Sequence, residues 1–403
     1  MNYNFDEMLD RSNTHAVAID GVGRPGGFGP EAPQDGFDFI PMWIADMNFE
    51  GPRSVVDALV ARAKHPAYGY FITSDEYYDS IIDWHARRKG VLDLTRDAIG
   101  YENGVLGGLA TAVRAFTAPG DKILIHAPTY IGFTGTLNAS GRTMVHSQLI
   151  KDEDGVWRMD FEDMERKLRD ENIHFAVFCS PFNPCGRVWE RWEIERALEL
   201  YEKYECVVFD DEIWSDLILG DKPQIATQSV NAWARENVIS LYAPSKTFNL
   251  AGLVGSYHVV YNKRLRDRMH TVAQAMHYNS MNVMSEQALI GAYSTEGEAW
   301  LDQLLPYLRH NRDFACDYIH DHFEGVDVFR PEGTYMLFLD CASWLDKHHK
   351  SLTDLEHAGW NVGVGWQDGA QFNGPTHIRM NLALPLPKVK EAFERLDRYV
   401  FNA

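Results

Sequence analysis

Residues 242–253, YAPSKTFNLAGL, place a lysine, Lys246, in an unusual setting. The run before it, residues 237–242, is rich in β-branched and apolar side chains and is typical of a buried strand. Small residues flank the lysine, so we expect its amine to point into a crowded pocket. A neutral, buried amine can attack a carbonyl in Schiff-base chemistry and then move protons as a general base. From this segment alone, a surface lysine in a turn is the alternative.

The size and composition of the chain limit its class. Its 403 residues exceed one ordinary hydrophobic core and predict two domains. Apolar residues make up 45% of it, which indicates a globular protein rather than a disordered or fibrous one. The formal net charge is −20, and no cluster of Lys and Arg interrupts the acidic residues. This charge argues against nucleic acid and membrane as partners and makes a small molecule the expected ligand.

The N-terminal residues and the cysteine spacing bear on the cellular location and on the state of the thiols. The first seven residues are acidic and polar and lack the features of a signal peptide, and no later apolar run reaches membrane-spanning length. The five cysteines are odd in number and form no C-x-x-C pair, which argues against a disulfide framework and a zinc site. We therefore expect a cytoplasmic protein with reduced, packed thiols and no metal.

The order of apolar segments predicts an α/β fold. From about residue 97, short apolar runs alternate with amphipathic stretches, which is typical of a mostly parallel sheet sandwiched by helices. Seven strands are expected, near residues 99–101, 122–126, 143–147, 175–179, 206–210, 238–242 and 257–261. One long helix is expected over residues 265–293. We predict a large domain over residues 51–290, and a smaller α/β domain formed by residues 291–403 with an N-terminal segment, residues 1–50.

Four features follow strands, at the carboxyl edge where open α/β sheets bind ligands. Glycines in residues 103–108 join a strand to a helix, so backbone amides there can bind a phosphate, although a plain tight turn explains them equally well. Two prolines in residues 180–186 fix a loop so that Asn183 can be held in one orientation, and a proline-rich loop that merely turns is the alternative. Residues 210–212 are three acids, and at least one must be buried and paired, for example with a heterocyclic nitrogen. Lys246 is the fourth feature.

Five segments together resemble the pyridoxal-phosphate enzymes of aminotransferase fold type I and, within them, the MalY/PatB-like carbon–sulfur β-lyases. They are residues 41–49, 180–189, 211–213, 243–253 and 377–383, in the order of that family. The resemblance covers nearly the whole chain. It implies a fold-type I transferase fold, pyridoxal 5'-phosphate as cofactor, an amino-acid substrate and a homodimer with shared active sites.

The resemblance also implies which residues bind the cofactor. Lys246 matches the catalytic lysine that binds the cofactor covalently and shuttles the proton, and Asp211 matches the acid that pairs with the pyridine nitrogen. Asn183 matches the amide that hydrogen-bonds the phenolic oxygen. The other implied contacts are the ring-stacking Tyr130, the phosphate-binding amides of Val105, Leu106 and Gly107, Tyr70 from a neighbouring subunit, Trp214 and Ser245.

Substrate contacts follow from the same resemblance. Arg379 matches the arginine that binds the substrate α-carboxylate, a task suited to its bidentate fork. Ala45 and Trp366 are the other expected substrate contacts. Trp214 stands where lyases of this family usually have histidine, and residues 365–369 replace a more familiar loop near the substrate. If both tryptophans face the substrate, they favour a thioether over a second carboxylate.

The implied function is β-elimination from cystathionine or a related L-cysteine S-conjugate. Lys246 would remove the α-proton, and a thiol, pyruvate and ammonia would be released. An aminotransferase that passes the amino group to a 2-oxo acid would use the same residues, so only the substrate pocket separates the two. A non-catalytic scaffold with a decayed site is a third alternative, and the intact set of Lys246, Asp211, Asn183 and Arg379 argues against it.

Overall fold

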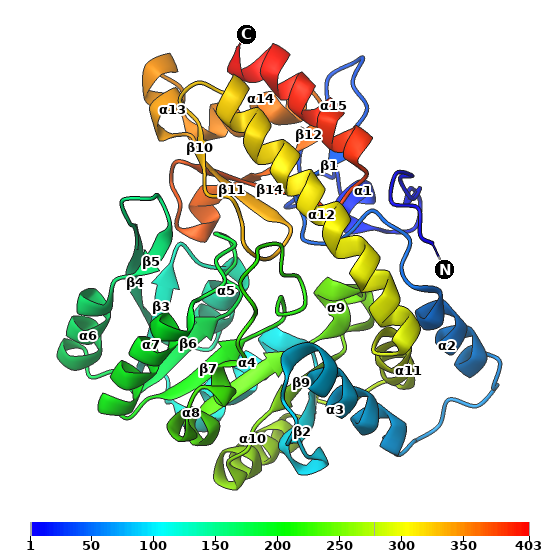
Figure 1. Cartoon of the computed structure of the whole chain (residues 1–403), viewed down its shortest axis with the longest axis vertical. Coiled ribbons are helices and arrows are strands. Elements are labelled where there is room, and N and C mark those ends of the chain that lie inside the picture. The colour runs from blue at the N-terminus through cyan, green and yellow to red at the C-terminus, as the bar shows by residue number, and fades with distance from the viewer. Residues whose placement is uncertain (1, 278, 403) are drawn as a thin grey trace. The chain divides into compact units, whose positions relative to one another are not determined.

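The computed structural model describes residues 2–277 and 279–402, which form two compact units (Figure 1). The larger unit contains residues 51–182 and 187–302, and the smaller contains residues 1–50, 183–186 and 303–403. Residues 183–186 therefore belong with the smaller unit although their chain neighbours belong to the larger one. Within the described ranges, no helix is long and apolar enough to cross a membrane.

A mixed sheet forms the centre of the larger unit (Figure 1). In the described part of the chain it has eight strands in the order β2-β9-β8-β7-β6-β3-β4-β5. Their bounds are β2 Ile99–Glu102, β3 Lys122–Ala127, β4 Thr143–Lys151, β5 Trp157–Met159, β6 Phe175–Cys179, β7 Val207–Asp211, β8 Val238–Tyr242 and β9 Ser256–Val259. The predicted, mostly parallel α/β fold is confirmed, with all seven expected strands present and β5 added antiparallel to β4.

The strand directions bring several loops to one edge of this sheet. Strand β9 runs antiparallel to both β8 and β2, so β2 points the same way as β8. The carboxyl ends of β2, β3, β6, β7 and β8 therefore share one edge. Strands β6 and β8 are buried at every position, as expected for strands covered on both faces.

Helices follow most strands of the larger unit. They are α2 Arg53–Ala63, α3 Asp75–Lys89, α4 Val105–Phe116, α5 Ile131–Ala139, α6 Phe161–Asp170, α7 Arg191–Lys203, α8 Ala232–Asn237, α9 Pro244–Thr247, α10 Lys263–Met276 and α11 Val283–Ala292. The predicted single helix over residues 265–293 is wrong, because α10 and α11 are separate. His277 adopts a left-handed conformation (φ 55°) that ends α10, and the side chain of Asn282 caps α11. Tyr278, inside that predicted helix, lies outside the described residues.

The smaller unit has its own sheet and core. Its described strands are ordered β10-β11-β14-β13, with β1 and β12 as a separate parallel pair. Their bounds are β1 Ile40–Pro41, β10 Asp327–Val328, β11 Met336–Asp340, β12 Val364–Gly365, β13 Gln367–Asp368 and β14 His377–Asn381. The helices are α1 Val17–Asp20, α12 Thr295–His322, α13 Ala342–His348, α14 Leu352–Asn361 and α15 Leu386–Leu396, and α12 begins in the larger unit. Ile40 and Met42 join the C-terminal residues in one apolar core, so residues 1–50 are integral to this unit.

Short turns of other helical types complete the chain. They are the 3₁₀ turns Arg96–Ala98, Thr227–Ser229, Ala251–Leu253 and Gly369–Phe372, and the π-helical turn Asp397–Phe401. The turn Ala251–Leu253 ends the segment that carries Lys246.

Candidate active site

Lys246 lies on α9, which starts directly after β8 at the carboxyl edge of the larger sheet. Pro244 occupies the first helical position, where the missing backbone N–H costs little. The Lys246 Nζ lies 5.5 Å from the centroid of the Trp214 ring, which is within cation–π range. Lys246 is half-buried, as is its neighbour Ser245, so the amine is less enclosed than the sequence predicts. Trp214 itself is buried and forms one wall beside the amine.

Asp211 ends β7, the strand next to β8, and its side chain is buried. Its Oδ1 accepts a hydrogen bond from the Ile213 N–H at 2.9 Å. Burial raises the pKa of Asp211 to about 7, although the Ile213 N–H and the charge of Lys246 oppose that rise. A cation placed beside this carboxyl therefore stabilises its ionised form. Asp211 is suited to a heterocyclic nitrogen that carries a proton.

The acids on either side of Asp211 are buried and have other partners. Burial and the nearby Glu212 raise the pKa of Asp210 well above its ordinary range. Glu212 accepts hydrogen bonds from the Thr227 N–H at 3.2 Å and from Gln224 Nε2 at 3.5 Å. Alternation along the strand turns Asp211 to the face opposite both neighbours. Of the three consecutive acids, Asp211 is the one whose pKa responds to Lys246.

The start of α4 suits an anion. Gly104, just before the helix, has φ 80° and, as a glycine, provides no capping side chain. The first turn carries backbone N–H groups, among them those of Val105 and Leu106, and the helix dipole adds partial positive charge. A Cβ at Gly108 would lie 2.8 Å from Leu241 on β8, so the glycine lets α4 pack close to the strand that precedes Lys246. Gly107 lies in the same first turn.

Tyr130 lies beside this helix start. It follows β3 and immediately precedes α5, and its half-buried ring packs edge-on against Phe133 with centroids 5.4 Å apart. A Cβ at Gly132 would lie 2.4 Å from the Tyr130 ring and 2.8 Å from the Leu106 side chain. Gly132 therefore brings the ring of Tyr130 next to the first turn of α4.

These residues fit pyridoxal phosphate. Along one edge of the sheet, the larger unit presents an amine on Lys246, a buried carboxyl on Asp211 that titrates near neutrality, an aromatic ring on Tyr130 and a helix start preceded by Gly104. An aldehyde, a pyridine nitrogen, an aromatic ring and a phosphate are the matching groups of the cofactor. The predicted Tyr70 is fully exposed in this chain.

Arg379 lies in the middle of β14 in the smaller unit, opposite Gln367 of β13, and is 3% exposed. Its Nε and Nη2 donate to Gln367 Oε1 at 3.1 and 2.5 Å, and its Nη1 donates to Asn183 Oδ1 at 3.4 Å. Nη2 also donates to the Trp43 carbonyl at 3.3 Å, and the guanidinium lies 4.3 Å from the Phe372 ring centroid. These acceptors are neutral oxygens that a substrate carboxylate can replace. The predicted Asn183 and Arg379 are thus brought together.

The prediction that Trp366 faces the substrate is wrong. Its side chain is fully buried, its indole N–H donates to the Glu356 carbonyl at 2.9 Å, and a Cβ at Gly359 would lie 2.3 Å from its ring. It belongs to the apolar core of the smaller unit. Gln367, the first residue of β13, pairs with Arg379 across the sheet and lies against its guanidinium instead. Alternation of buried and polar residues was the signal that could have identified Gln367.

Ala45 lies in a turn that is hydrogen-bonded to a side chain of β14. Its neighbours Ile44 and Asp46 offer their carbonyls to Asn381 Nδ2 at 2.7 and 2.6 Å. Asn381 is two residues after Arg379, so both side chains occupy the same face of the strand. The half-buried Ala45 is therefore presented on the Arg379 side of the sheet. Asn381 is a second residue that the sequence analysis missed.

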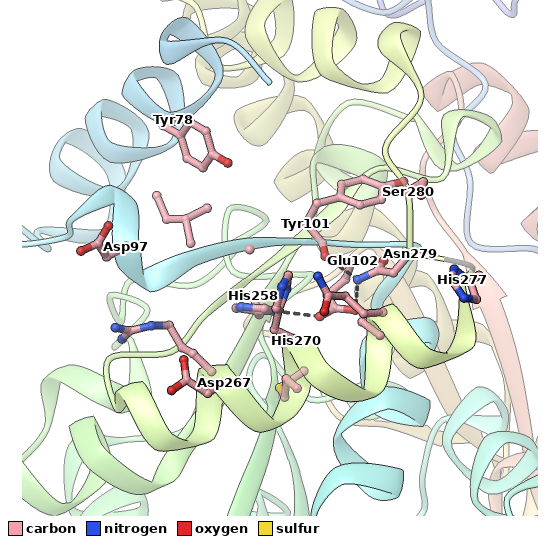
Figure 2. A pocket seen from close by; sticks show the side chains of 16 residues that line it. Tyr78, Asp97, Tyr101, Glu102, His258, Asp267, His270, His277, Asn279 and Ser280 are labelled. Carbon is pink, nitrogen blue, oxygen red and sulfur yellow. Dashed lines mark hydrogen bonds and ion pairs between the residues drawn. The ribbon is translucent and has the colours of Figure 1, made fainter. Parts of the chain in front are cut away.

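A separate hollow of about 800 Å³ lies at the edge strand β2 (Figure 2). The buried Glu102 in its wall binds His258 Nδ1 at 2.8 Å and accepts from Asn279 Nδ2 at 3.1 Å. Gly100 gives the His258 ring room to cross the strand pair, because a Cβ there would lie 2.4 Å from that ring. None of the residues predicted for the active site is among the described residues that line this hollow.

Known proteins match the chain over almost its full length. The aminotransferase class I and II family model matches residues 45–396. Cystathionine beta-lyase PatB of Bacillus subtilis (strain 168) is 31% identical over 98% of this chain and 98% of that protein, and Protein MalY of Escherichia coli (strain K12) is 27% identical over 96% of each. The crystal structure of the PLP-bound C-S lyase from Staphylococcus hominis is 28% identical, with a TM-score of 0.88, and 99% of each chain is covered.

Proposed function

This chain belongs to the aminotransferase class I and II family, and we propose that it is a pyridoxal-phosphate-dependent carbon–sulfur β-lyase acting on cystathionine or a related L-cysteine S-conjugate. The family and cofactor predicted from the five motifs are confirmed. The observation that carries the proposal is the placement of Lys246 and the buried Asp211 on adjacent strand ends.

Each candidate residue has one task toward the cofactor. When bound, pyridoxal phosphate supplies an electron-withdrawing ring that makes the α-hydrogen of an attached amino acid acidic. Asp211 would keep the ring nitrogen protonated by offering its carboxylate. The first turn of α4 would hold the phosphate, Tyr130 would cover one face of the ring, and Asn183 would donate to the phenolic oxygen. Lys246 would hold the cofactor covalently until the substrate amine displaces it.

Proton transfer falls to Lys246. The free Lys246 amine would take the α-proton, and the electron pair left on the α-carbon would expel the thiolate from the β-carbon. The thiolate takes up a proton and leaves as a thiol. The aminoacrylate that remains reacts with water to give pyruvate and ammonia, which balances the reaction without an oxidant or an acceptor.

Substrate selectivity depends on the residues around the Lys246 amine and around the position of the substrate α-carboxylate. Arg379 would bind the α-carboxylate that all amino acids share, so it gives no selectivity among side chains. The buried Trp214 beside Lys246 is an apolar surface, which favours a thioether over a second carboxylate. This wall supports a lyase acting on sulfur conjugates over a transaminase of acidic amino acids.

Product analysis of the purified protein tests the proposed function. With cystathionine or S-methylcysteine, and no added 2-oxo acid, we expect pyruvate and ammonia in equal amounts. Lactate dehydrogenase coupling measures the pyruvate. Transfer of the amino group to added 2-oxoglutarate without pyruvate release would instead identify an aminotransferase.

Replacing Arg379 by alanine should raise the KM for every amino-acid substrate. The loss of one buried, charge-assisted pair costs roughly 2 to 4 kcal/mol, which is roughly a 30-fold to 800-fold rise in KM. Steady-state kinetics with cystathionine and S-methylcysteine measure it. Arg395→Ala is the control, because Arg395 binds Asp38 and Glu391 in the same unit. An unchanged KM for both substrates would remove Arg379 from carboxylate binding.

We also propose a homodimer with shared active sites. Tyr70 is fully exposed, Ile72 is 91% exposed and Tyr68 is 59% exposed, so an apolar segment faces solvent in the single chain. Such segments are typical of surfaces that an assembly covers. A hollow of about 660 Å³ lies between this segment and residues 280–283. In the proposed dimer, Tyr70 reaches the phosphate of the neighbouring site.

Mixed dimers test this arrangement. Tyr70→Ala and Lys246→Ala each damage every site in their own homodimer. Co-refolding equal amounts makes half of the dimers mixed, each with one intact site, so about a quarter of wild-type activity should return. Sedimentation velocity establishes the assembly. A fully active monomer, or no recovery of activity on mixing, would contradict the shared site.

We further propose a cytoplasmic location. All five cysteines are buried thiols. Thiols persist in this form in reducing compartments. Fractionation of the native cell with an antibody against the protein would test it.

A further inference from the structure

The residue after Lys246 makes a buried polar contact that the cofactor site does not use. Thr247 is fully buried, and its hydroxyl donates to Asp216 Oδ2 at 3.2 Å. Asp216 Oδ1 in turn lies 2.7 Å from Lys89 Nζ, and the two side chains are only 5% and 3% exposed. Lys89 is the last residue of α3. A buried ion pair thus links α3 to the helical turn that carries Lys246.

The loop after β7 contacts both Lys246 and Thr247. Trp214 places its ring centroid 5.5 Å from Lys246 Nζ. Asp216, two residues later in the same loop, accepts from the Thr247 hydroxyl. The loop therefore touches two consecutive residues of α9, one through its side-chain amine and one through its hydroxyl.

Both members of the Lys89–Asp216 pair have further hydrogen-bond partners. Burial opposes the ionisation of Asp216, but the charge and hydrogen bond of Lys89 and the Trp84 indole N–H, 3.2 Å away, keep its pKa below the ordinary range. Lys89 also donates to Ser215 Oγ at 2.6 Å. Apolar packing would hold α3 against the loop equally well, because a buried pair gains little over it. Unlike apolar packing, the ion pair fixes a carboxylate oxygen of Asp216 that accepts a directional hydrogen bond from the Thr247 hydroxyl.

Phe248, the next residue, is fixed from the same helix. The Trp84 ring lies edge-on to the Phe248 ring, with centroids 5.7 Å apart. Trp84 is itself stacked on Tyr293 at 4.6 Å. Helix α3 therefore restrains both residues that follow Lys246, one by a hydrogen bond through Asp216 and one by aromatic packing.

We propose that the Lys89–Asp216 ion pair is a positioning device that fixes, through the Thr247 hydroxyl, the turn that holds the Lys246 amine beside Trp214. The inference rests on the proposed function, because it takes Lys246 as the residue that binds the cofactor and moves the proton. Lys89, Asp216 and Thr247 are positioning residues, since they act through Lys246. A small displacement of a catalytic amine costs rate because the reacting atoms must meet in a narrow range of geometry.

The variants Thr247→Val and Thr247→Ser distinguish the effect of losing the hydroxyl from the effect of changing the side-chain shape. Valine keeps the branched shape of threonine and loses the hydroxyl donor. The rate at which the apoprotein binds the cofactor covalently and kcat should therefore each fall about tenfold, with KM little changed. Serine keeps the donor and should restore both. Stopped-flow absorbance after pyridoxal phosphate is added to the apoprotein measures the rate of covalent cofactor binding independently of turnover. Thr247→Ala gives the same comparison if the valine variant does not fold.

Ser147→Ala is the matched control. The Ser147 hydroxyl donates to Asp163 Oδ2 at 2.9 Å, and Asp163 is held by Lys167 at 2.6 Å, so the same types of group meet at β4. We expect Ser147→Ala to lower the Tm of the apoprotein and leave cofactor binding and kcat unchanged. If Thr247→Val behaves like Ser147→Ala, the network is merely structural and the positioning role is overturned.

The outcomes also separate this inference from the proposed function. Wild-type binding rate and kcat in Thr247→Val, in a protein that releases pyruvate, would refute the positioning role alone. Failure of the wild-type protein to bind pyridoxal phosphate at Lys246, or to release pyruvate, would refute the proposed function itself.

Discussion

Lys246→Ala is expected to abolish pyruvate release from cystathionine and covalent attachment of the cofactor. In the proposed mechanism the Lys246 amine has two roles, as the group that holds the cofactor covalently and as the base that takes the α-proton. A positioned general base alone contributes about 10² to 10⁴ in rate, so the loss of both roles should exceed about a thousandfold in kcat. The first turn of α4 remains in the variant, so the cofactor should still bind without a covalent bond.

Borohydride reduction followed by peptide mapping measures the attachment. We expect the pyridoxyl group on the peptide that contains Lys246 in the wild type and on no peptide in the variant. Lys222→Ala is the control, because Lys222 is an exposed lysine of the same unit, paired with Glu190. A pyridoxyl group on another lysine of the wild type would move the catalytic role away from Lys246.

The part of the candidate site that lies in the larger unit was predictable because its position depends on strand order. Asp211 and Lys246 each follow an apolar run, and β7 and β8 pair in parallel, so their carboxyl ends had to share one edge. The position of Tyr130 after β3 follows from the same rule. Local sequence therefore determines which residues lie at this edge. The burial of each side chain could be obtained only from the structure.

The surroundings of Arg379 were less predictable. They depend on the register that pairs Gln367 with Arg379 and on Asn183, which is far away in sequence. The prediction chose the large aromatic Trp366, whereas that residue lies between β12 and β13 and its ring packs into the core. An error of one residue in a strand moves a side chain to the other face.

The link from Lys89 to Thr247 could not be predicted at all. Its members lie on α3, on the loop after β7 and on α9, and no periodic pattern connects these three segments. Taken alone, a lysine at the end of a helix is typical of a solvated residue that complements the helix dipole. Only tertiary packing buries it beside Asp216.

The protonation of Asp211 gives a prediction for the apoprotein. Its pKa is about 7 in the folded chain, above the ordinary value of 3.8, so the folded state binds a proton more tightly than the unfolded state does. The stabilising contribution of this proton is full below the ordinary value and is lost as the pH rises toward 7. In Asp211→Asn that loss disappears, so from pH 5 to 8 the Tm of the wild-type apoprotein should fall relative to that of the variant. Parallel Tm profiles would contradict the raised pKa.

Asp211→Asn should retain the cofactor but reduce kcat by about 10² to 10³, the effect of removing one preorganised electrostatic group. The amide can still hydrogen-bond a ring nitrogen, yet it carries no charge to keep that nitrogen protonated, so electron withdrawal from the α-carbon weakens. Absorbance of the bound cofactor and steady-state kinetics measure the two effects separately. Asp210→Asn is the matched control, because Asp210 is the buried acid that precedes Asp211 on β7 and its side chain points to the opposite face of the sheet. Wild-type kcat in Asp211→Asn, together with a large loss in Asp210→Asn, would transfer the role to Asp210.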